Sequence, residues 1–384
     1  MNNLKIKITD IDENLKIYIL LFSILGYLAK GLFDIQFGLY LGIVLGLFLL
    51  SQVFNNLRVN RFVFIYSLIS LLAYFLIIFN NTFDEGLFFL PIILSSLGIS
   101  IAIIDTVFEY KKFHYNLSKI ILYALFIYCV VFFILFEDMN YALKGSRNMI
   151  SAYLLCLLPY YYMVRHINGD KVSIWIAFFT FLICLISVGT AGVILSFFFL
   201  YALLHIRYKY LTFFLLIIIF FVYSFELQNY FYSFLNKIDP EILSKILYRL
   251  DINNLYGPSI RGVILNNYIS NLDLFSFFYG IKLENLHWNI NGIDYYNPHN
   301  SYLLLHAKSG ILVFVYLSII GVTLYKLFKL NKVLFFLFLV IILRASSDTV
   351  SFAHGYFEWS IYLFFLYIFY YKNRVNSIKI GFSK

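Results

Sequence analysis

The chain has 384 residues, of which 62% are apolar and 13% are charged, and its formal net charge is +9. A water-soluble protein of ordinary composition carries about 25% charged residues, so the composition excludes an ordinary soluble domain. The basic residues are spread between apolar runs and form no single patch, so the positive charge does not indicate nucleic-acid binding, and we expect no nucleic-acid partner.

Apolar runs that approach the ~20 residues of a membrane-spanning helix recur along the chain. They are continuously apolar, as in 211–225, and lack the alternation of a barrel strand. Because the bilayer core offers no water to backbone groups, such runs must form helices. The sequence therefore predicts an all-α polytopic membrane protein with about twelve transmembrane helices. Their expected positions are 17–32, 36–54, 62–79, 87–104, 119–136, 149–164, 172–187, 191–206, 211–225, 309–325, 333–350 and 359–371.

The charges between these runs predict the orientation of the chain. With the amino terminus inside, every inner segment is more basic than the short outer segments beside it, as the positive-inside rule requires. The basic residues of the short outer segments are Lys30, Lys144, Arg147 and Arg344. Both termini are therefore expected in the cytoplasm.

One long segment, 226–308, separates the ninth expected span from the tenth and faces outward. It is rich in Asn, Gly and Pro but also in aromatic residues, which favours an ordered cap over a disordered linker. Helical spacing of apolar residues predicts helices at 241–250 and 260–272. The expected organisation is a bundle of nine spans over 1–225, the external cap over 226–308, and three spans with a cytoplasmic tail over 309–384.

A polar run at the end of the cap holds the first candidate for chemistry, His299. Pro298 disfavours helix at the residue before it, and Asn300 or Ser301 could cap the helix that follows. A histidine held there titrates near neutral pH and could act as a general base. The alternative is a solvated loop histidine whose neighbours cap a helix and do nothing else. Tyr302 closes the run and is a candidate for substrate contact.

Four arginines are expected at or near the outer face: Arg147, Arg249, Arg261 and Arg344. The guanidinium group matches phosphate oxygens and keeps its charge, so these residues could together hold a pyrophosphate group. The alternative for each is a contact with solvent or with lipid headgroups. Arg344 is unusual because it lies inside an apolar run, and Asp348 is its expected partner at helical spacing.

The sequence gives no indication of a metal or cofactor. It contains no Gly-rich phosphate loop and no paired zinc-binding histidines. Cys129, Cys156 and Cys184 all fall in expected helices, far apart in sequence, and are interpreted as small apolar core residues. We expect neither a disulfide bond nor a metal site.

The segment 249–310 resembles the O-antigen polymerase and ligase superfamily of bacterial inner-membrane glycosyltransferases. The strongest match is His299-Asn300, followed after nine residues by Gly310; Val313 departs from the residue usual at the last position of the pattern. The expected topology, the late external loop, Arg261 near the start of a helix in that loop, and Arg147-Asn148 before the sixth span are also similar to the family. The stretch 187–192 departs from it, because the family often has a Ser-Arg pair there.

The resemblance implies an enzyme of the bacterial inner membrane whose donor is an oligosaccharide on undecaprenyl pyrophosphate. His299 would deprotonate or orient the acceptor hydroxyl, and Arg261 with Arg249 would stabilise charge on the leaving pyrophosphate. Arg147, Arg249 or Arg344 would then have to supply the arginine missing from 187–192. Trp288 of the cap would stack on sugar faces, and Asn300 and Tyr302 would contact substrate. A flippase and a chain-length regulator are possible protein partners, and the bilayer is the surrounding solvent.

Three functions remain open at this stage. A polymerase would join repeat units of O-antigen or capsular polysaccharide to one another, and a ligase would move the finished chain to lipid A core. The imperfect motif favours the polymerase. A flippase or transporter of lipid-linked oligosaccharide belongs to a different class and is disfavoured, because such proteins show repeats and midplane charges that the sequence lacks.

Overall fold

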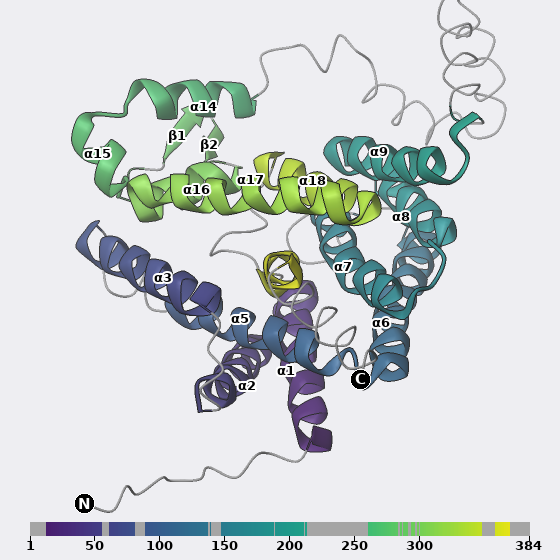
Figure 1. Ribbon diagram of the computed structural model, residues 1–384. Helices are drawn as coiled ribbons and strands as arrows, with labels where there is room; N and C mark the ends of the chain where they lie inside the picture. The colour runs from purple at the N-terminus through teal and green to yellow at the C-terminus, as the bar shows by residue number, and fades with distance from the viewer. Residues whose placement is uncertain are drawn as a thin grey trace, which may run out of the picture. The chain divides into compact units, whose positions relative to one another are not determined.

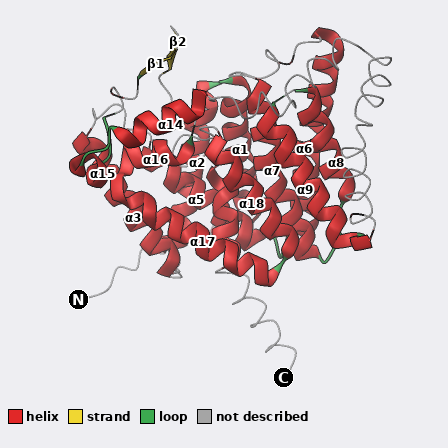
Figure 2. Cartoon of the chain, turned by 90° about the horizontal axis from the view of Figure 1, so that it is seen from above, coloured by secondary structure: helices red, strands yellow, loops and turns green. Residues whose placement is uncertain are grey.

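A computed structural model describes residues 13–55, 61–80, 89–136, 139, 147–187, 189–210, 212, 260–282, 285, 287–290, 293–295, 298, 300–347 and 358–368. Nearly all of these residues are helical (Figure 2). The all-α fold class is thereby confirmed for the described part of the chain, with one exception that the sequence analysis did not predict. This is a two-stranded hairpin within the expected cap.

The chain forms two compact units, each assembled from separate stretches of sequence. Unit 1 comprises Met1–Leu117, Asn271–Lys326 and Asp348–Lys384, and unit 2 comprises Ser118–Ser270 and Leu327–Ser347. This division follows packing, whereas the expected organisation into bundle, cap and bundle follows the sides of a membrane. Two long helices, α6 (Lys111–Phe136) and α17 (Val313–Leu330), begin in one unit and end in the other.

In unit 1, α2 packs against both α1 and α5, and α16 packs on α3. A 3₁₀ turn, η3, joins α16 to α17, and β1 pairs antiparallel with β2, Trp288 lying opposite Tyr295. The hairpin connection is Asn291-Gly292, the pair that two-residue hairpin loops prefer. The other elements of unit 1, labelled in Figure 1 except for η3, are α1 (Glu13–Phe33), α2 (Gln36–Asn55), α3 (Arg61–Asn80), α5 (Phe89–Thr106), α15 (Leu274–Tyr279), β1 (Trp288–Ile290), β2 (Ile293–Tyr295), α16 (Ser301–Ser309) and η3 (Gly310–Leu312). A further helix of unit 1 covers Glu358–Ile368.

In unit 2, α18 packs against α7 and α9, and α8 packs against both α7 and α9. The three cysteines lie on α6, α7 and α8, and all are buried, as the sequence predicted; their thiols are free. The helix predicted at 260–272 is confirmed as α14, whereas the one predicted at 241–250 lies outside the described residues. The elements of this unit are α7 (Arg147–Asn168), α8 (Ile174–Ile186), α9 (Thr190–Arg207), α14 (Ile260–Ser270) and α18 (Lys332–Ser347).

Every expected span contains a helix except 211–225, which lies almost entirely outside the described residues. Among the described residues, three helices are long and apolar enough to cross a membrane: Asn14–Phe33, Lys111–Phe136 and Ser301–Leu330. The third is longer than expected, because α16 and η3 run directly into α17 and move its start from 309 to 301. The total of twelve spans stays a prediction.

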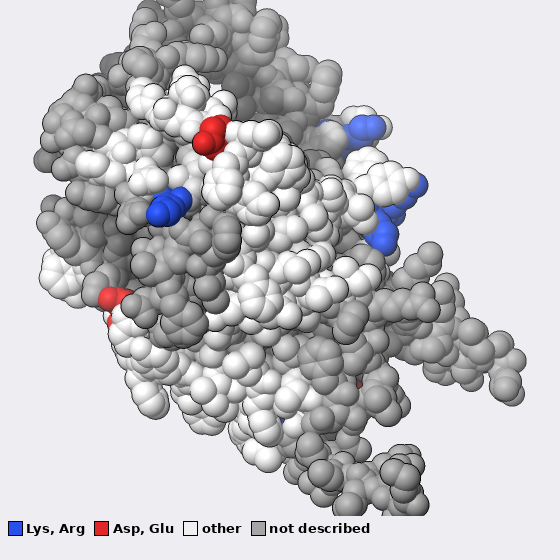
Figure 3. Space-filling view, turned by 90° about the vertical axis from the view of Figure 1, so that its left-hand side faces the viewer, with Lys and Arg blue, Asp and Glu red and all other residues white. Residues whose placement is uncertain are grey.

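Apolar side chains cover the outside of these helices as well as the inside. On α6, Ile120 is 64% exposed and Ile134 is 70% exposed. On the face drawn in Figure 3, most of the described atoms belong to uncharged residues. Water-soluble proteins avoid extended apolar surfaces of this kind. The long apolar helices are consistent with a membrane protein.

A stripe of glycines on α2, formed by Gly38, Gly42 and Gly46, lets neighbouring helices approach closely. A Cβ atom added at Gly46 would lie 2.6 Å from the carbonyl oxygen of Ser95 on α5, and one added at Gly38 would lie 2.6 Å from that of Gly26 on α1. Small residues at four-residue spacing are a common packing device for helices in membranes. The backbone of α2 therefore packs closely against both α1 and α5.

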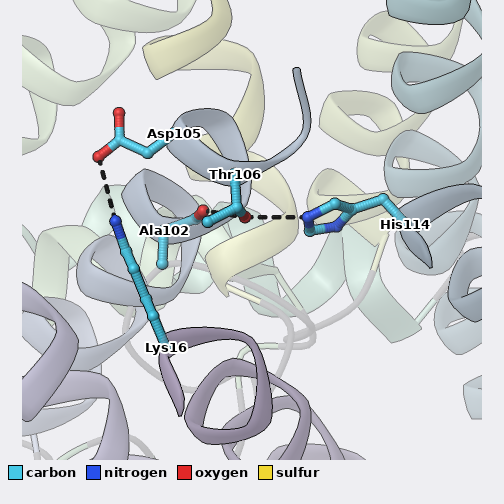
Figure 4. A network of polar contacts seen from close by, with 5 residues as sticks. All are labelled: Lys16, Ala102, Asp105, Thr106 and His114. Carbon is cyan, nitrogen blue, oxygen red and sulfur yellow. Dashed lines mark hydrogen bonds and ion pairs between the residues drawn. The ribbon is translucent and has the colours of Figure 1, made fainter. Parts of the chain in front are cut away.

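A polar network joins α1, α5 and the start of α6 within unit 1 (Figure 4). The Lys16 ammonium group lies 3.8 Å from the Asp105 carboxylate. The Thr106 hydroxyl donates to the carbonyl of Ala102 at 2.6 Å, and His114 Nε2 lies 2.9 Å from the same hydroxyl. Because that hydroxyl has one proton and gives it to Ala102, Nε2 of His114 must be the protonated nitrogen.

One end of unit 2 gathers three connections that the charge pattern placed on the same side of the membrane. Arg165 Nε donates to the Lys171 carbonyl at 3.1 Å, and Arg207 Nη1 lies 3.5 Å from the Val172 carbonyl. The Asn331 amide donates to Nδ1 of His166 over 2.9 Å. The 165–173 loop, the end of α9 and the turn before α18 therefore lie together.

Replacing Gly46 with alanine is expected to lower the thermal midpoint of the detergent-solubilised protein, because the new methyl group would collide with the backbone of Ser95. Overpacking of this kind costs about 1–3 kcal/mol. Gly321→Ala on α17 is the matched control, since its Cβ meets nothing within 4 Å and alanine favours helix. Equal midpoints for the two variants would contradict the packing of α2 on α5.

Candidate functional site

The candidate site is the end of the expected cap, where the described chain runs from α15 through the hairpin to α16. Asp273 caps α15: its carboxylate accepts from the Ser276 amide at 2.7 Å, and its own amide donates to the Ser276 hydroxyl at 3.0 Å. This reciprocal arrangement is a capping box. The hydrogen bonds from Ser276 lower the pKa of the exposed Asp273 carboxyl below its usual value.

Asn300 is the N-cap of α16. Its side-chain oxygen accepts hydrogen bonds from the backbone amides of Tyr302 at 2.9 Å and Leu303 at 3.2 Å. These are two of the amides that the first turn of a helix leaves without a partner inside the helix. The capping expectation is confirmed with Asn300 rather than Ser301 as the cap. Tyr302, in the first turn, is partly buried.

The other end of α16 is closed by Gly310. Its φ of +52° lies in the left-handed region, and a Cβ atom there would lie 2.1 Å from the carbonyl oxygen of Phe278 on α15. The Gly310 amide donates to the His306 carbonyl and so ends the helix. Glycine is therefore required at this position of the motif both by backbone conformation and by the approach of α15.

The segments α15 and α16 interlock through a second glycine. Gly280, with φ +93°, ends α15, and a Cβ atom there would lie 2.3 Å from the carbonyl oxygen of Ala307. The next amide, of Ile281, donates to that carbonyl at 2.9 Å. The His306 ring makes a further contact between α16 and α15, since its Nε2 donates to the Phe277 carbonyl at 3.1 Å. We call the contact of α15 with α16 and η3 the cap junction.

Two buried titratable residues of α16, His306 and Lys308, are not among the predicted site residues. His306 forms a hydrogen bond across the cap junction. Lys308 is 8% exposed and belongs to α16, which packs on α3. Their position in the sequence could have identified them as candidates. Both residues come after His299 and directly before an expected span, where the chain changes from polar to apolar. Ionisable residues at such a depth carry a functional hypothesis by default.

The structure divides the predicted site residues between the two units. Asn300, Tyr302 and Trp288 belong to unit 1, with Trp288 on β1 opposite Tyr295. Arg344, Arg261 and Arg147 belong to unit 2, on α18, α14 and α7. The side chains of Arg261 and Arg147 lie outside the described residues. His299 and Arg249 lie outside them altogether.

Arg344 is the predicted arginine whose side chain the structure describes, and it is 1% exposed in the last turn of α18. Its Nη1 donates to the Ser347 hydroxyl at 2.8 Å, and its charge acts on the thiol of Cys184 near the end of α8. Asp348, the expected partner, lies outside the described residues. A guanidinium group so deeply buried depends on polar neighbours, and the Ser347 hydroxyl on the same helix is one of them.

Among the described residues, no group of three or more His, Cys, Asp or Glu side chains could hold a metal ion. Comparisons with protein-family models, curated proteins and solved structures found no match. The resemblance to the O-antigen polymerase and ligase superfamily therefore rests on the sequence motif alone and stays a prediction.

Replacing Gly310 with alanine is expected to separate α15 from α16, because the methyl group would collide with the Phe278 carbonyl. Gly169→Ala is the matched control: Gly169 also has a positive φ, +74°, but a Cβ atom there meets nothing within 4 Å. Both variants carry the backbone cost of about 1–2 kcal/mol. We expect a larger drop in thermal midpoint and faster protease cleavage within 271–300 for Gly310→Ala. Identical losses would contradict the cap junction.

Proposed function

We propose that the protein is a polysaccharide polymerase of the bacterial inner membrane. It transfers an oligosaccharide repeat unit, of O-antigen or capsular type, from undecaprenyl pyrophosphate to a sugar hydroxyl of another lipid-linked unit. The reaction takes place on the outer face of the membrane. The proposed topology has about twelve spans, cytoplasmic termini and an external loop over 226–308.

The observation that carries this proposal is the backbone geometry of the motif. Two of its three residues have defined roles, because Asn300 starts α16 and Gly310 ends it against α15. The residue beside the cap, His299, directly precedes Asn300 and so lies at the start of α16, the first part of the apolar segment Ser301–Leu330. A general base needs such an anchored position where a polar segment meets the membrane surface.

The gathering of loops at one end of unit 2 supports the proposed orientation. The basic residues Arg165, Lys171 and Arg207 come from two connections that charge alone assigned to the cytoplasm, and their hydrogen bonds bring those connections together. The start of α18, at Asn331, joins them through His166. Chain segments on one side of a bilayer can meet in this way, whereas a wrong orientation for one helix would separate them.

The proposed chemistry needs no nucleotide or metal, since the lipid-linked donor is already activated. His299 takes the proton of the acceptor hydroxyl while its oxygen forms a bond to the anomeric carbon of the donor. The bond from that carbon to the pyrophosphate oxygen breaks, and undecaprenyl pyrophosphate leaves with the electron pair. Arg261 and Arg249 stabilise the charge that grows on the leaving group.

The remaining predicted residues would bind the substrate. Arg147 and Arg344 hold the pyrophosphate, and the burial of Arg344 suits a fixed contact with an anion, since buried guanidinium groups interact strongly with phosphate oxygens. Trp288 offers an aromatic face to sugar rings. Tyr302 and the Asn300 amide nitrogen contact the transferred glycan. Partner proteins of this system would be a flippase that supplies the donor and a regulator of chain length.

Replacing His299 with alanine is expected to abolish surface polymer in cells that contain normal amounts of the protein, because the acceptor hydroxyl loses its base. His287→Ala is the matched control, since His287 is an exposed histidine of the same external segment. Polysaccharide gels and analysis of lipid-linked intermediates provide the readout. A polymerase leaves single units on the carrier, a ligase would leave full-length polymer there, and a flippase would leave single units on the cytoplasmic side. Intact polymer in His299→Ala would overturn the mechanism.

Replacing Asn300 with aspartate separates capping from substrate contact. Aspartate keeps the oxygen that accepts from the amides of Tyr302 and Leu303, so we expect an unchanged thermal midpoint. It lacks the amide nitrogen, so we expect a loss of polymer synthesis. Asn300→Ala, which removes the cap, should in addition lose about 1 kcal/mol of stability. Full activity in Asn300→Asp would show that the residue acts as a helix cap and not on the substrate.

A further inference from the structure

A short apolar segment of the expected cap, 274–281, has most of its side chains on the outside of unit 1. It has the sequence Leu-Phe-Ser-Phe-Phe-Tyr-Gly-Ile and contains no charged residue, whereas Asp273 and Lys282 flank it on either side. Its helix, α15, contains no buried residue. An apolar run too short to span a bilayer belongs either to a protein core or to a membrane interface, and the exposure of α15 excludes the core.

The exposed side chains of α15 form one apolar face, made of Leu274, Phe275, Phe278 and Tyr279. Each of them is between 41% and 77% exposed. Residues four apart lie on the same side of a helix, and the ring centroids of Phe275 and Tyr279 are accordingly only 4.7 Å apart. Water-soluble proteins avoid contiguous apolar surfaces of this kind unless a partner covers them.

This apolar face is continuous with the exposed side of α17, which belongs to a segment long and apolar enough to cross a membrane. The Phe277 ring centroid lies 5.4 Å from that of Phe278 and 5.9 Å from that of Phe314, in the first turn of α17. Phe314 is itself 48% exposed, and Ile311 and Leu317 beside it are exposed as well. If α17 spans the bilayer, lipid covers these residues and reaches the apolar face of α15.

The backbone of the segment is prepared for contact with lipid. The Ser276 amide donates to the Asp273 carboxylate at 2.7 Å, and the Gly280 amide donates to the Ser276 carbonyl at 2.9 Å. The Ile281 amide donates to the Ala307 carbonyl of α16, also at 2.9 Å. Lipid offers no partner to backbone groups, so a segment that enters it must satisfy them within the protein. These hydrogen bonds meet that requirement at both ends of α15.

The side chains of the segment suit hydrocarbon better than a glycan, the other ligand that an exposed aromatic surface could fit. A sugar site needs polar groups beside its aromatic rings. In 274–281 only the Ser276 and Tyr279 side chains can form hydrogen bonds, and the Ser276 hydroxyl is engaged with the Asp273 carboxylate at 2.6 Å. Tyrosine at the margin of an apolar surface is typical of a membrane interface.

We propose that α15 anchors the cap to the membrane: its apolar face lies among the lipids at the boundary where α17 enters the bilayer, on the outer side in the proposed topology. The cap is then held at the membrane surface by its own side chains as well as by its connection to α17. Because α15 and α16 meet at the cap junction (Figure 1), the anchor also holds the start of α16 there. The partner is the bilayer itself, and the inference does not depend on glycosyl transfer.

Nitroxide spin labels on the full-length protein in liposomes test the proposal. The label on Leu274→Cys should collide with oxygen, which concentrates in lipid, more often than with a water-soluble nickel chelate. Phe314→Cys on α17 is the lipid reference, and Asn285→Cys, at an exposed polar residue of the cap, is the water reference. We expect the ratio of the two collision rates at Leu274 to resemble that at Phe314 and to exceed that at Asn285 several-fold. The native cysteines are buried, and the unmodified chain treated in the same way is the blank.

Phe278→Cys, one turn further along the same face, repeats the test and replaces Leu274→Cys if that variant fails to fold. A ratio like that of Asn285 at these positions would overturn the proposal. Such a ratio that changes only when the repeat-unit oligosaccharide is added to the solution would assign the face to sugar binding instead. A label protected from both reagents would also overturn the proposal, because it would show that protein and not lipid covers the face.

Discussion

Apolar side chains on both the inner and the outer faces of the helices impose the constraint on which the rest of the structure depends. In hydrocarbon there is no water to satisfy a backbone amide or carbonyl, so the chain must be helical wherever it is surrounded by lipid. The same constraint sends most charges to the ends of helices. It also makes a buried ionisable group such as Arg344 dependent on polar neighbours, among them the Ser347 hydroxyl.

Close backbone contacts take the place of the hydrophobic effect in holding the helices together, because lipid solvates apolar side chains as well as a neighbouring helix does. The glycine stripe of α2 against Ser95 and the cap junction at Gly280 and Gly310 follow this same principle. At the junction, the contact has a second consequence. It fixes the polar end of the cap to the helix that follows Asn300, so the proposed general base is attached to a rigid element.

Much of the fold could be predicted from the sequence, because hydropathy and charge report directly on the solvent around each helix. The helices, the buried cysteines, α14 and the Asn300 cap follow from local patterns. The hairpin at Trp288–Ile290 and Ile293–Tyr295 was missed, because three-residue strands give too short an alternation to detect. The role of His306 depends on its hydrogen bond to the Phe277 carbonyl, between segments separated in the chain, and no local pattern reports such a contact. The roles of His299 and Arg249 stay predictions.

The central claim is that the protein joins lipid-linked glycan units, and reconstitution tests it most directly. The purified full-length chain would be placed in liposomes that contain undecaprenyl pyrophosphate carrying a single repeat unit, without nucleotide or added metal. The account predicts lipid-linked chains of two or more units, together with release of one undecaprenyl pyrophosphate for each bond formed. A donor that stays intact, or that crosses the bilayer without any new glycosidic bond, would contradict it.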